Sequence, residues 1–446
     1  MVDFGRSDDP RVQAQLDRLS RLSVPQGRFG LETIRALMER LGNPHRKLPP
    51  VFHVAGTNGK GSVCAFLRAM LEADGKRVHV TTSPHLVRYN ERIRLAGNLI
   101  EDGALAELLE EVLDAGEDLS PSFFEVTIAA AFLAFSRTPA DACVVEVGLG
   151  GRFDATNVLE PEAVAACGIA ALGLDHEKFL LAPEEGVPKE PMARIAFEKA
   201  GIAKKGVPLV TMGSRYPTEA QGEIAKTAAT SGALHRPFGH GLLVDKSSWY
   251  CDNSGGLRDW LYYRDSFENE LDLPYPSMPG AHQVENAGLA IAILRSQGKV
   301  EVGKAAMADG LRKAQWPARM QLMSDGPLTV LAADQKVWLD GGHNTSAGEA
   351  IAEAIEGPLH LILGMLDNKN PRALLDPFEG RVRTLSVVPV TGHDHHPPSA
   401  FGELAMARTD LEDALLNVPS DGFPILIAGS LYLAGEALRL NDEVPD

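Results

Sequence analysis

A glycine-rich loop lies between a short apolar run and a helical pattern near the start of the chain. Its residues are Gly56, Thr57, Asn58, Gly59, Lys60, Gly61 and Ser62. Small residues let backbone N–H groups converge on an anion where a helix begins, and Lys60 would reach the β- and γ-phosphates of a nucleotide. The loop departs from the strict P-loop pattern, because Gly61 follows Lys60 where Ser or Thr is usual. Such a loop is often only a turn, but its position between a strand and a helix favours nucleotide binding.

A carboxylate, Glu146, lies near the end of the apolar run 143–147. An ionised carboxylate is costly in such a strand unless a cation meets it. In a nucleotide-binding sheet that cation is usually Mg²⁺. The alternative is an ion pair with a buried arginine such as Arg152. Glu146 is therefore a candidate metal ligand.

Two more polar residues follow in the same half of the chain. His176 comes just after an apolar run and so at the carboxyl end of an expected strand, where open α/β sheets gather their ligands. A lone histidine is more often structural. Lys199 lies in a helical pattern and would ordinarily be a solvated lysine, so the residue pattern alone gives it no special role.

In the second half, the apolar run 337–340 leads to an edge where Asp340, His343 and Asn344 follow one another closely. These side chains would face anything bound between two domains. The alternative is that Asn344 only caps a helix. The group at 393–396 (HDHH) resembles a metal site, but two prolines follow at once and no distant Cys or His is spaced to complete it. We interpret it as a solvated loop.

The elements that must position these residues alternate between strand and helix. The run 51–55, the glycine loop and the helical pattern through residue 71 predict strand, loop and amphipathic helix. The run 78–82 then completes a βαβ unit of a parallel sheet. Ser120 and Pro121 predict the beginning of a long apolar helix that continues to residue 135.

We therefore expect an α/β protein with two domains. Residues 1–297 would form a P-loop-type domain with a mostly parallel sheet and a small β subdomain at about 235–278. Residues 298–446 would form a C-terminal Rossmann-like α/β domain.

Composition excludes several other classes of protein. The chain has 446 residues, of which 44% are hydrophobic, enough for two real cores. The net charge of −17 would repel a polyphosphate backbone, so no nucleic-acid partner is expected. The most apolar helical stretch is far shorter than the ~20 residues of a membrane span, and the first residues do not form a secretory signal. The four cysteines form no CxxC pair, and we expect a cytoplasmic protein without a membrane partner.

Taken together, these motifs resemble the folylpolyglutamate synthase and dihydrofolate synthase family, which is related to the muramyl-peptide (Mur) ligases. The matching segments in the first half are 56–62 (GTNGKGS), 83–86 (SPHL), 90–93 (NERI), 146–157 (EVGLGGRFDATN), 174–176 (LDH) and 198–202 (EKAGI). Those in the second half are 282–283 with 286–287, 316–317 with 319–320, 340–344, and 429–432. An ordered set of this kind is far more specific than any single loop.

The resemblance implies ATP bound between two domains, with Lys60 on its phosphates. It implies one Mg²⁺ held by Ser83 and Glu146 and a second held by His176. It also implies that Lys199 is carbamylated, which turns a cation into an anionic ligand. The residues that would complete the ATP site are Asn286, Arg319, Asp340 and His343. Lys369 and Ser430 would contact glutamate. Arg92 belongs to the stretch 86–92, which would lie beside the pterin, and would contact that substrate.

The sequence departs from the family pattern at several places. Gly342 and Ala318 stand where Ala and Gly are usual, and 367–370 (DNKN) is a loose version of the family's more acidic motif. The stretch 181–189 is longer than the family usually allows, so the loop near the second metal ion is expected to be remodelled.

The implied activity is ATP-dependent amide ligation in folate biosynthesis and one-carbon metabolism. A substrate carboxylate would take the γ-phosphoryl group of ATP, and the amine of L-glutamate would attack the acyl phosphate, with ADP and phosphate released. The acceptor is dihydropteroate, a reduced folate whose polyglutamate tail grows, or both, and we favour the bifunctional interpretation. The alternatives are a Mur-type ligase acting on a UDP-muramyl peptide, or a nucleotide-binding regulator without catalysis. We expect a monomer.

Overall fold

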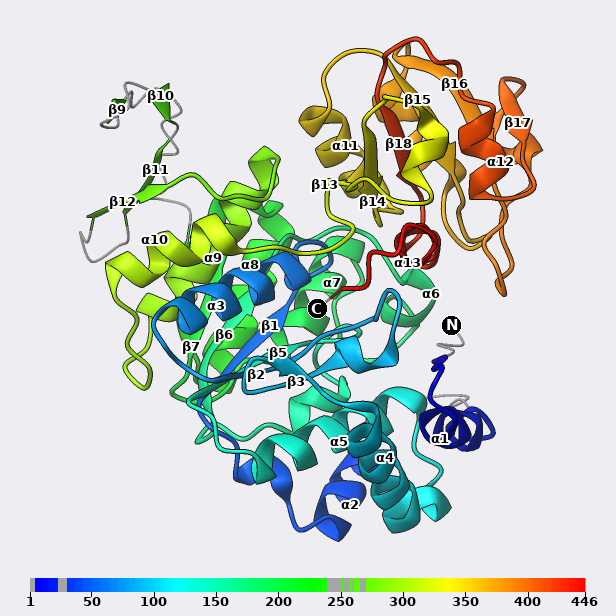
Figure 1. The fold of residues 1–446 in the computed structure, drawn as a ribbon. Helices are drawn as coiled ribbons and strands as arrows, with labels where there is room; N and C mark the ends of the chain where they lie inside the picture. Colours follow the sequence, from blue (N-terminus) through cyan, green and yellow to red (C-terminus); the bar gives the residue numbers. More distant parts are fainter. Residues whose placement is uncertain are drawn as a thin grey trace. The chain divides into compact units, whose positions relative to one another are not determined.

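The computed structural model describes residues 5–22, 30–238, 250–251, 257–258, 260–264 and 270–445. The chain divides into two compact units (Figure 1). The first consists of Met1–Ser83, Arg88–Ser277 and Gln283–Gln315, and the second of Pro84–Val87, Met278–His282 and Trp316–Asp446. Among the described residues, no helix has both the length and the apolar character that crossing a membrane requires.

Among the described residues, the sheet of the first unit has eight strands. Their spatial order is β4 (Asn98–Leu99), β3 (Ile93–Leu95), β2 (Val78–Thr81), β5 (Ala142–Glu146), β1 (Val51–Ala55), β6 (Val164–Ile169), β7 (Pro208–Thr211) and β8 (Leu234–Pro237). Neighbours from β2 to β8 are parallel, whereas β3 and β4 add an antiparallel edge. All residues of β1 and β5 are buried, as expected for central strands covered on both faces. The predicted mostly parallel sheet is confirmed.

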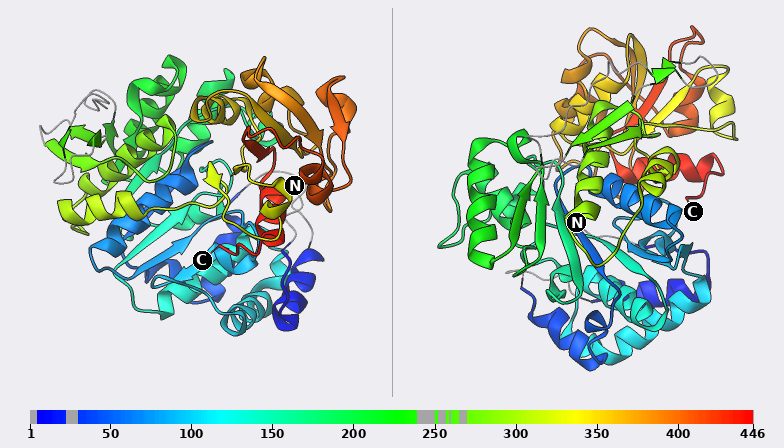
Figure 2. Two further views of the ribbon diagram at one scale, coloured as in Figure 1. Left: turned by 45° about the horizontal axis from the view of Figure 1, so that its top comes forward. Right: turned by 90° about the vertical axis from the view of Figure 1, so that its left-hand side faces the viewer.

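Helices cover both faces of this sheet (Figure 2). The helices of this part of the chain are α1 (Pro10–Ser20), α2 (Glu32–Arg40), α3 (Lys60–Ala73), α4 (Asp102–Gly116), α5 (Phe123–Arg137), α6 (Glu177–Leu180), α7 (Pro191–Ala200), α8 (Thr218–Ser231), α9 (Ala281–Arg295) and α10 (Lys304–Lys313). Helix α3 packs against α10, α7 packs against α8, and α4 packs against α1 and α5. The expected end of the first domain, after residue 297, falls between α9 and α10. Because α10 packs on α3, the first unit continues to Gln315.

Helix α5 begins later than predicted. Its N-cap is Ser122, whose hydroxyl accepts a hydrogen bond from the backbone N–H of Glu125, while the Glu125 side chain accepts one from the backbone N–H of Ser122. This capping box fixes the first turn. Ser120 instead has φ of +50° at the end of the preceding turn, so the N-cap predicted there is wrong.

The β subdomain expected at about 235–278 is described only in part. Its first residues, in β8, belong to the main sheet. Two antiparallel pairs follow, β9 (Tyr250–Cys251) with β10 (Leu257–Arg258) and β11 (Trp260–Arg264) with β12 (Glu270–Pro274). The rest of this region lies outside the described residues.

The second unit has a six-stranded sheet. The spatial order is β13 (Gln321–Leu322), β14 (Val337–Asp340), β18 (Ile425–Ala428), β15 (Leu359–Leu363), β16 (Val382–Val387) and β17 (Ala405–Ala407). All neighbouring pairs are parallel except β13 with β14. The helices are α11 (Thr345–Ala354), α12 (Leu411–Leu416) and α13 (Leu431–Leu440).

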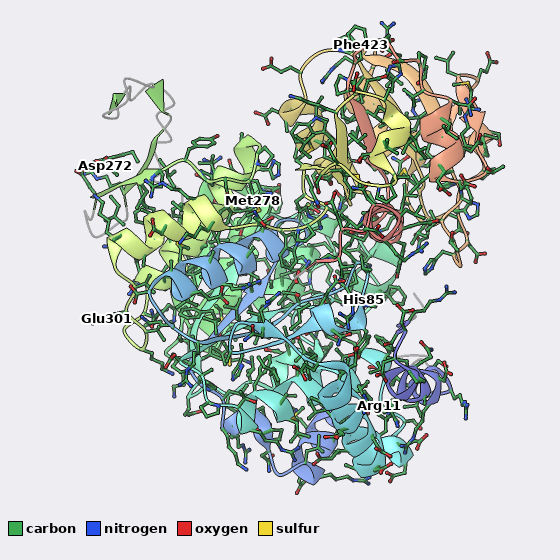
Figure 3. The ribbon with its side chains drawn as sticks, viewed as in Figure 1. Arg11, His85, Asp272, Met278, Glu301 and Phe423 are labelled. Carbon is green, nitrogen blue, oxygen red and sulfur yellow. The ribbon has the colours of Figure 1, made fainter. Side chains whose placement is uncertain are left out.

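Side chains on the two faces of β18 build two separate hydrophobic cores. Ile425 and Ile427 join a cluster with residues of α12 and α13, whereas Leu426 and Ala428 join a cluster with residues of α11. Alternate residues of a strand point to opposite faces, so helices cover both sides of the sheet. Figure 3 labels Phe423 in this unit. The guanidinium carbon of Arg383 lies 4.3 Å from the centre of the Phe423 ring. The α/β fold class predicted for this half is confirmed.

Candidate active site

The predicted phosphate loop begins where β1 ends and finishes in the first turn of α3. The backbone N–H groups of Thr57 and Asn58 donate to the carbonyl oxygen of Ala171 at 2.8 and 3.2 Å. The Thr57 hydroxyl also donates to the carbonyl oxygen of Gly173 at 2.9 Å. These bonds fasten the loop to the segment after β6. The first N–H groups of α3 have no partner within the helix and are suited to an anion.

Two glycines of the loop have conformations and neighbours that a side chain would disturb. Gly56 has φ of +151°, and a Cβ atom there would lie 2.8 Å from that of Ala170. Gly59 has φ of +81°, and a Cβ atom would meet the amide oxygen of Asn286. Asn286 is buried and donates to Gln283 at 3.1 Å. The fold thus brings Asn286, predicted for the ATP site, next to the loop.

Lys60 and Ser62 lie in the first turn of α3. The Lys60 amine donates to the carbonyl oxygen of Thr57 at 3.3 Å, which leaves hydrogens for a phosphate. Ser62 is 1% exposed, and its hydroxyl has no hydrogen-bond partner among the described residues. A buried hydroxyl without a partner is costly, so Ser62 is suited to a ligand. Sequence reasoning assigned Ser62 only to the nucleotide and did not identify it as a candidate metal ligand.

Glu146 is buried at the end of β5, beside Val54 of β1 and so at the start of the phosphate loop. Its carboxylate accepts a hydrogen bond of 3.2 Å from the backbone N–H of Ser83. The two residues predicted for the first metal ion are therefore adjacent. The alternative partner, Arg152, pairs instead with Glu184 and Glu198.

The donors near the phosphate loop fit a divalent cation bound together with a nucleotide. Within the described ranges, no group of three or more His, Cys, Asp or Glu side chains could hold a metal ion by itself. Mg²⁺ is usually held by one or two carboxylates together with substrate phosphates. The buried carboxylate of Glu146 and the unpartnered hydroxyl of Ser62 supply such a set.

Lys199 is buried, not solvated. Its side chain lies near the C-terminal end of α7, and its amine donates to the carbonyl oxygen of Gly56 at 2.9 Å. Burial, together with the positive charge of Lys60, lowers the pKa of Lys199 to about 7. A large fraction of Lys199 is therefore neutral near pH 7, which the sequence pattern did not indicate.

His176 precedes α6 with φ of +52°, a left-handed conformation in which His is enriched among non-glycine residues. Its neighbour Asp175 raises the pKa of Lys199, against the larger effect of burial. The turn of Asp175 and His176 is thus close enough to Lys199 for their charges to interact. Whether His176 binds a metal ion stays a prediction.

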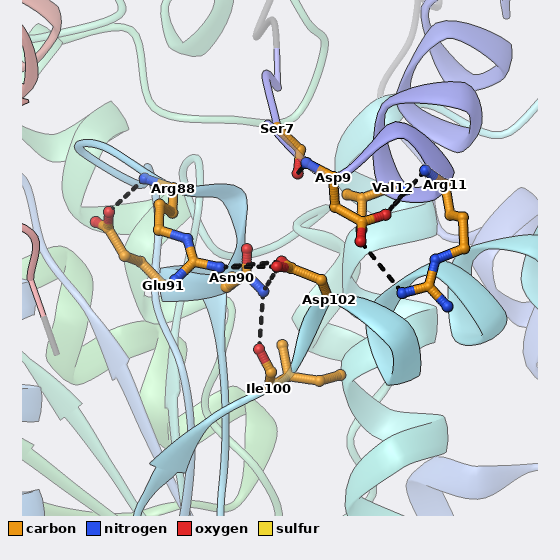
Figure 4. Close-up of polar contacts among 9 residues, drawn as sticks. All are labelled: Ser7, Asp9, Arg11, Val12, Arg88, Asn90, Glu91, Ile100 and Asp102. Atoms are coloured by element: carbon orange, nitrogen blue, oxygen red, sulfur yellow. Dashed lines mark hydrogen bonds and ion pairs between the residues drawn. The ribbon is translucent and has the colours of Figure 1, made fainter.

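The segment expected beside the pterin is held by a polar network (Figure 4). Asn90 donates to the carbonyl oxygen of Ile100 and to Asp102, at 2.8 and 2.9 Å, and Arg88 pairs with Asp102 at 3.0 Å. Arg92 is fully buried, with its guanidinium carbon 5.5 and 5.4 Å from the ring centres of Tyr89 and Phe123. Arg92 therefore packs inside this segment. Its contact with a substrate stays a prediction.

In the second unit, Asp340 organises the edge predicted from the sequence. It is buried, and its carboxylate accepts from the backbone N–H groups of Met320 and Gly342 at 2.8 and 2.7 Å. The carbonyl oxygen of Gly341 is 3.1 Å from Nδ1 of His343. A Cβ atom on Gly341 would lie 2.8 Å from Arg319, so three predicted residues gather around one turn. Asn344 does cap α11, as the alternative interpretation held.

Lys369 and Ser430 also have structural partners. Ser430 is buried and caps α13 through the N–H of Tyr432 at 3.0 Å. The carbonyl oxygen of Lys369 accepts from Nε2 of His396 at 2.6 Å, so the histidine-containing loop packs on the Lys369 turn. Asp394 and His395 are exposed, in keeping with a surface loop. A role in binding glutamate stays a prediction.

Sequence reasoning missed a cluster of four charged residues near Lys199. Its members are Arg152, Glu184, Arg194 and Glu198. Only the spacing of Arg194 and Glu198, one helical turn apart, could have indicated part of it.

Comparison with known proteins identifies relatives over almost the whole chain. No protein-family model matches it. It is 32% identical over 423 residues to a folylpolyglutamate synthase of Lacticaseibacillus casei, covering 90% of this chain and 92% of the relative. It is 32% identical over 403 residues to a dihydrofolate synthase/folylpolyglutamate synthase of Bacillus subtilis, covering 86% and 84%.

Solved structures of enzymes of this kind also match the chain over almost its whole length. A bifunctional folylpolyglutamate synthase/dihydrofolate synthase of Yersinia pestis, complexed with AMPPNP and Mn, matches with a TM-score of 0.77 and 28% identity over 96% of this chain and 97% of that one. A further structure of a bifunctional enzyme of this type, with Mn, AMPPNP and L-glutamate bound, matches with a TM-score of 0.78 and the same identity and coverage. The chain belongs to the folylpolyglutamate synthase/dihydrofolate synthase family.

Proposed function

We propose that this protein is an ATP-dependent carboxylate–amine ligase that joins L-glutamate to dihydropteroate and to reduced folates, with ADP and phosphate as products. The observation that carries the proposal is the meeting of a phosphate loop, the buried carboxylate of Glu146 and the buried amine of Lys199 at one edge of the first unit's sheet. Relatives with this activity in their names, and structures that hold an ATP analogue, Mn and glutamate, support it.

The chain's own residues have distinct roles in the proposed reaction. Lys60 and the N–H groups at the start of α3 bind the β- and γ-phosphates and offset the charge that builds up during phosphoryl transfer. The acceptor's carboxylate oxygen attacks the γ-phosphorus, and the bond to ADP breaks. The amine of glutamate then attacks the acyl carbon, phosphate leaves, and the nitrogen loses a proton. Cys64, Cys143 and Cys167 are unsuited to form an acyl-enzyme, because they are buried and burial raises the pKa of each thiol.

A divalent metal ion would supply charge neutralisation and orientation of the phosphates. Glu146, Ser62 and Ser83 would hold one ion. His176 and a carbamylated Lys199 would hold a second. These assignments belong to the proposal, as do Asn286, Arg319, Asp340 and His343 for ATP and Arg92, Lys369 and Ser430 for the other substrates.

The environment of Lys199 supports the proposed carbamylation. The nitrogen of a neutral amine attacks the carbon of CO₂, an N–C bond forms, and one proton is released to solvent, which converts the group into an anion. The reaction needs the unprotonated amine, which burial and Lys60 favour by lowering the pKa of Lys199 to about 7.

Release of phosphate tests the proposed function. We expect it only when ATP, L-glutamate and a pteroate or folate acceptor are all present. Phosphate released with a UDP-muramyl peptide in place of the folate acceptor would indicate a Mur-type ligase. ATP binding without any acceptor-dependent release would indicate a regulator. Size measurement in solution would test the expected monomer.

A further inference from the structure

The four-residue cluster near Lys199 has two arginines and two glutamates in alternating contact. Arg152 pairs with Glu184 at 2.6 Å and with Glu198 at 2.8 Å. Arg194 pairs with the same two carboxylates at 2.9 and 3.1 Å. Each carboxylate therefore bridges both guanidinium groups. Contacts with two partners fix a side chain better than a single exposed ion pair does.

Burial makes the charge balance of this cluster important. The side chains of Arg194 and Glu198 are each only 6% exposed. Both guanidinium groups also lie near the ring of Phe197, at 4.9 and 5.9 Å from its centre. Without Glu184, two cations would share one carboxylate, and a buried charge without compensation is strongly unfavourable.

The cluster joins segments that carry proposed metal ligands. The backbone N–H of Arg152, in the loop after Glu146 and β5, donates to the carbonyl oxygen of Glu198 at 2.8 Å. Glu198 directly precedes Lys199 in α7. The Nε of Arg194 donates to the carbonyl oxygen of Leu180 at 3.0 Å, at the end of the short helix that follows His176.

Glu184 itself belongs to the segment 181–189, which lies between α6 and α7. We propose that Glu184 is a positioning residue: by bridging Arg152 and Arg194 it holds the segment that carries His176 against α7, so that His176 and Lys199 serve one metal ion. This inference rests on the proposed function. Glu184 touches neither substrate nor metal in this scheme, and acts only through its two arginines.

The test compares Glu184→Gln with Glu185→Gln. The first variant keeps the size of the side chain and removes its charge. Glu185 is the next residue and is exposed, so its variant controls for a lost surface charge. Binding of Mn²⁺ in the presence of AMPPNP is measured by electron paramagnetic resonance. We expect E184Q to bind Mn²⁺ about tenfold more weakly, the lower end of the effect typical of residues behind metal ligands, and E185Q to bind as the parent does.

A second readout separates positioning from general loss of stability. Limited proteolysis should cleave E184Q faster within residues 181–190, while AMPPNP affinity without metal stays at the parental value. In ligation assays, E184Q should need more Mg²⁺ for half-maximal rate, and saturating Mg²⁺ should restore most of kcat. If E184Q does not fold, Glu184→Asp is compared with Glu185→Asp in the same way. Weaker Mn²⁺ binding is then expected only for the Glu184 variant.

Parental Mn²⁺ affinity in the folded Glu184 variant would overturn the inference. An equal loss in the Glu185 variant would overturn it too. Failure of the proposed function has a different signature, because the parent protein itself would then release no phosphate with glutamate and a folate acceptor.

Discussion

The side-chain amine of Lys199 donates a hydrogen bond of 2.9 Å to the carbonyl oxygen of Gly56, the first residue of the phosphate loop. The bond joins the helix that carries the proposed metal-binding lysine to the loop proposed for ATP. A carbamate nitrogen keeps one N–H, so the same bond can persist after CO₂ has added. The proposed modification is therefore compatible with the loop conformation seen here.

Replacing Lys60 with Ala should strongly reduce the rate of ligation and weaken ATP binding while leaving the fold intact. The amine lies on a partly exposed turn and would act on phosphate charge, so we expect kcat to fall by about 10²–10³, as for loss of one preorganised donor. Titration with a fluorescent ATP analogue, with circular dichroism as the control for folding, measures this. Parental ATP affinity in K60A would refute the phosphate-loop assignment.

Lys199→Ala should lose activity and regain part of it when short carboxylic acids are added. Acetate or formate would supply an oxygen ligand where the carbamate is proposed. Rescue should depend on acid concentration and be absent in the parent and in K60A. A ligation rate of Lys199→Ala that does not change with acid concentration would contradict the proposed carbamate.

The rate of CO₂ addition to Lys199 should rise with pH and reach half its maximum near pH 7. The reactive amine is the unprotonated form, whose fraction grows as pH rises through the pKa of about 7. At that pH, an ordinary lysine would be unprotonated in roughly one protein molecule in a few thousand. Initial incorporation of ¹³CO₂ at fixed dissolved CO₂ measures this. Since Lys60 lowers the pKa of Lys199, K60A should shift the midpoint to higher pH.

Gly59→Ala should reduce both stability and ATP affinity. Gly59 has φ of +81°, and the added methyl group would press on Asn286. Gly75→Ala is the matched control, because Gly75 has φ of +77° and no atom within 4 Å of its would-be Cβ. Both variants should lose about 1–2 kcal/mol of unfolding free energy from the left-handed backbone. Only G59A should lose ATP affinity, and an equal loss in G75A would contradict the view that the loss in G59A comes from contact with Asn286.

An acyl phosphate passes one oxygen of the acceptor's carboxylate to the released phosphate. An acceptor labelled with ¹⁸O in that carboxylate should therefore give labelled phosphate, detected by mass spectrometry. Unlabelled phosphate, or AMP and pyrophosphate in place of ADP, would contradict the proposed mechanism.

The parts of the fold that local patterns determine were predictable from the sequence. The run ending at Ala55 and the helix that begins at Lys60 match the predicted strand and helix, because burial on both faces and helical periodicity leave clear traces in the sequence. The start of α5 was not predicted at the right residue, since both Ser120 and Ser122 precede an apolar helix. Glu125, three residues after Ser122, decides between them.

Features that depend on contacts across the sequence were not predictable. The low exposure of Lys199 arises from packing of α7 against the loops after β1 and β5, and nothing in its helical pattern distinguishes it from a surface lysine. Glu184 likewise stands in a segment rich in Gly, Pro and Glu, with no periodicity to mark it. Only the fold brings it to Arg152.

The segments Pro84–Val87 and Met278–His282 belong to the second unit although the first unit flanks them in the chain. Leu86 and Val87 pack on the cluster that contains Leu433 and Leu438, and Gly435 of α13 leaves no room for a methyl group beside the carbonyl oxygen of Leu86. The C-terminal half is therefore not modular. During synthesis, this face of its core can be covered only by residues made hundreds of positions earlier. An exchange of C-terminal halves between relatives would have to transfer residues 84–87 as well, or leave a mismatched core.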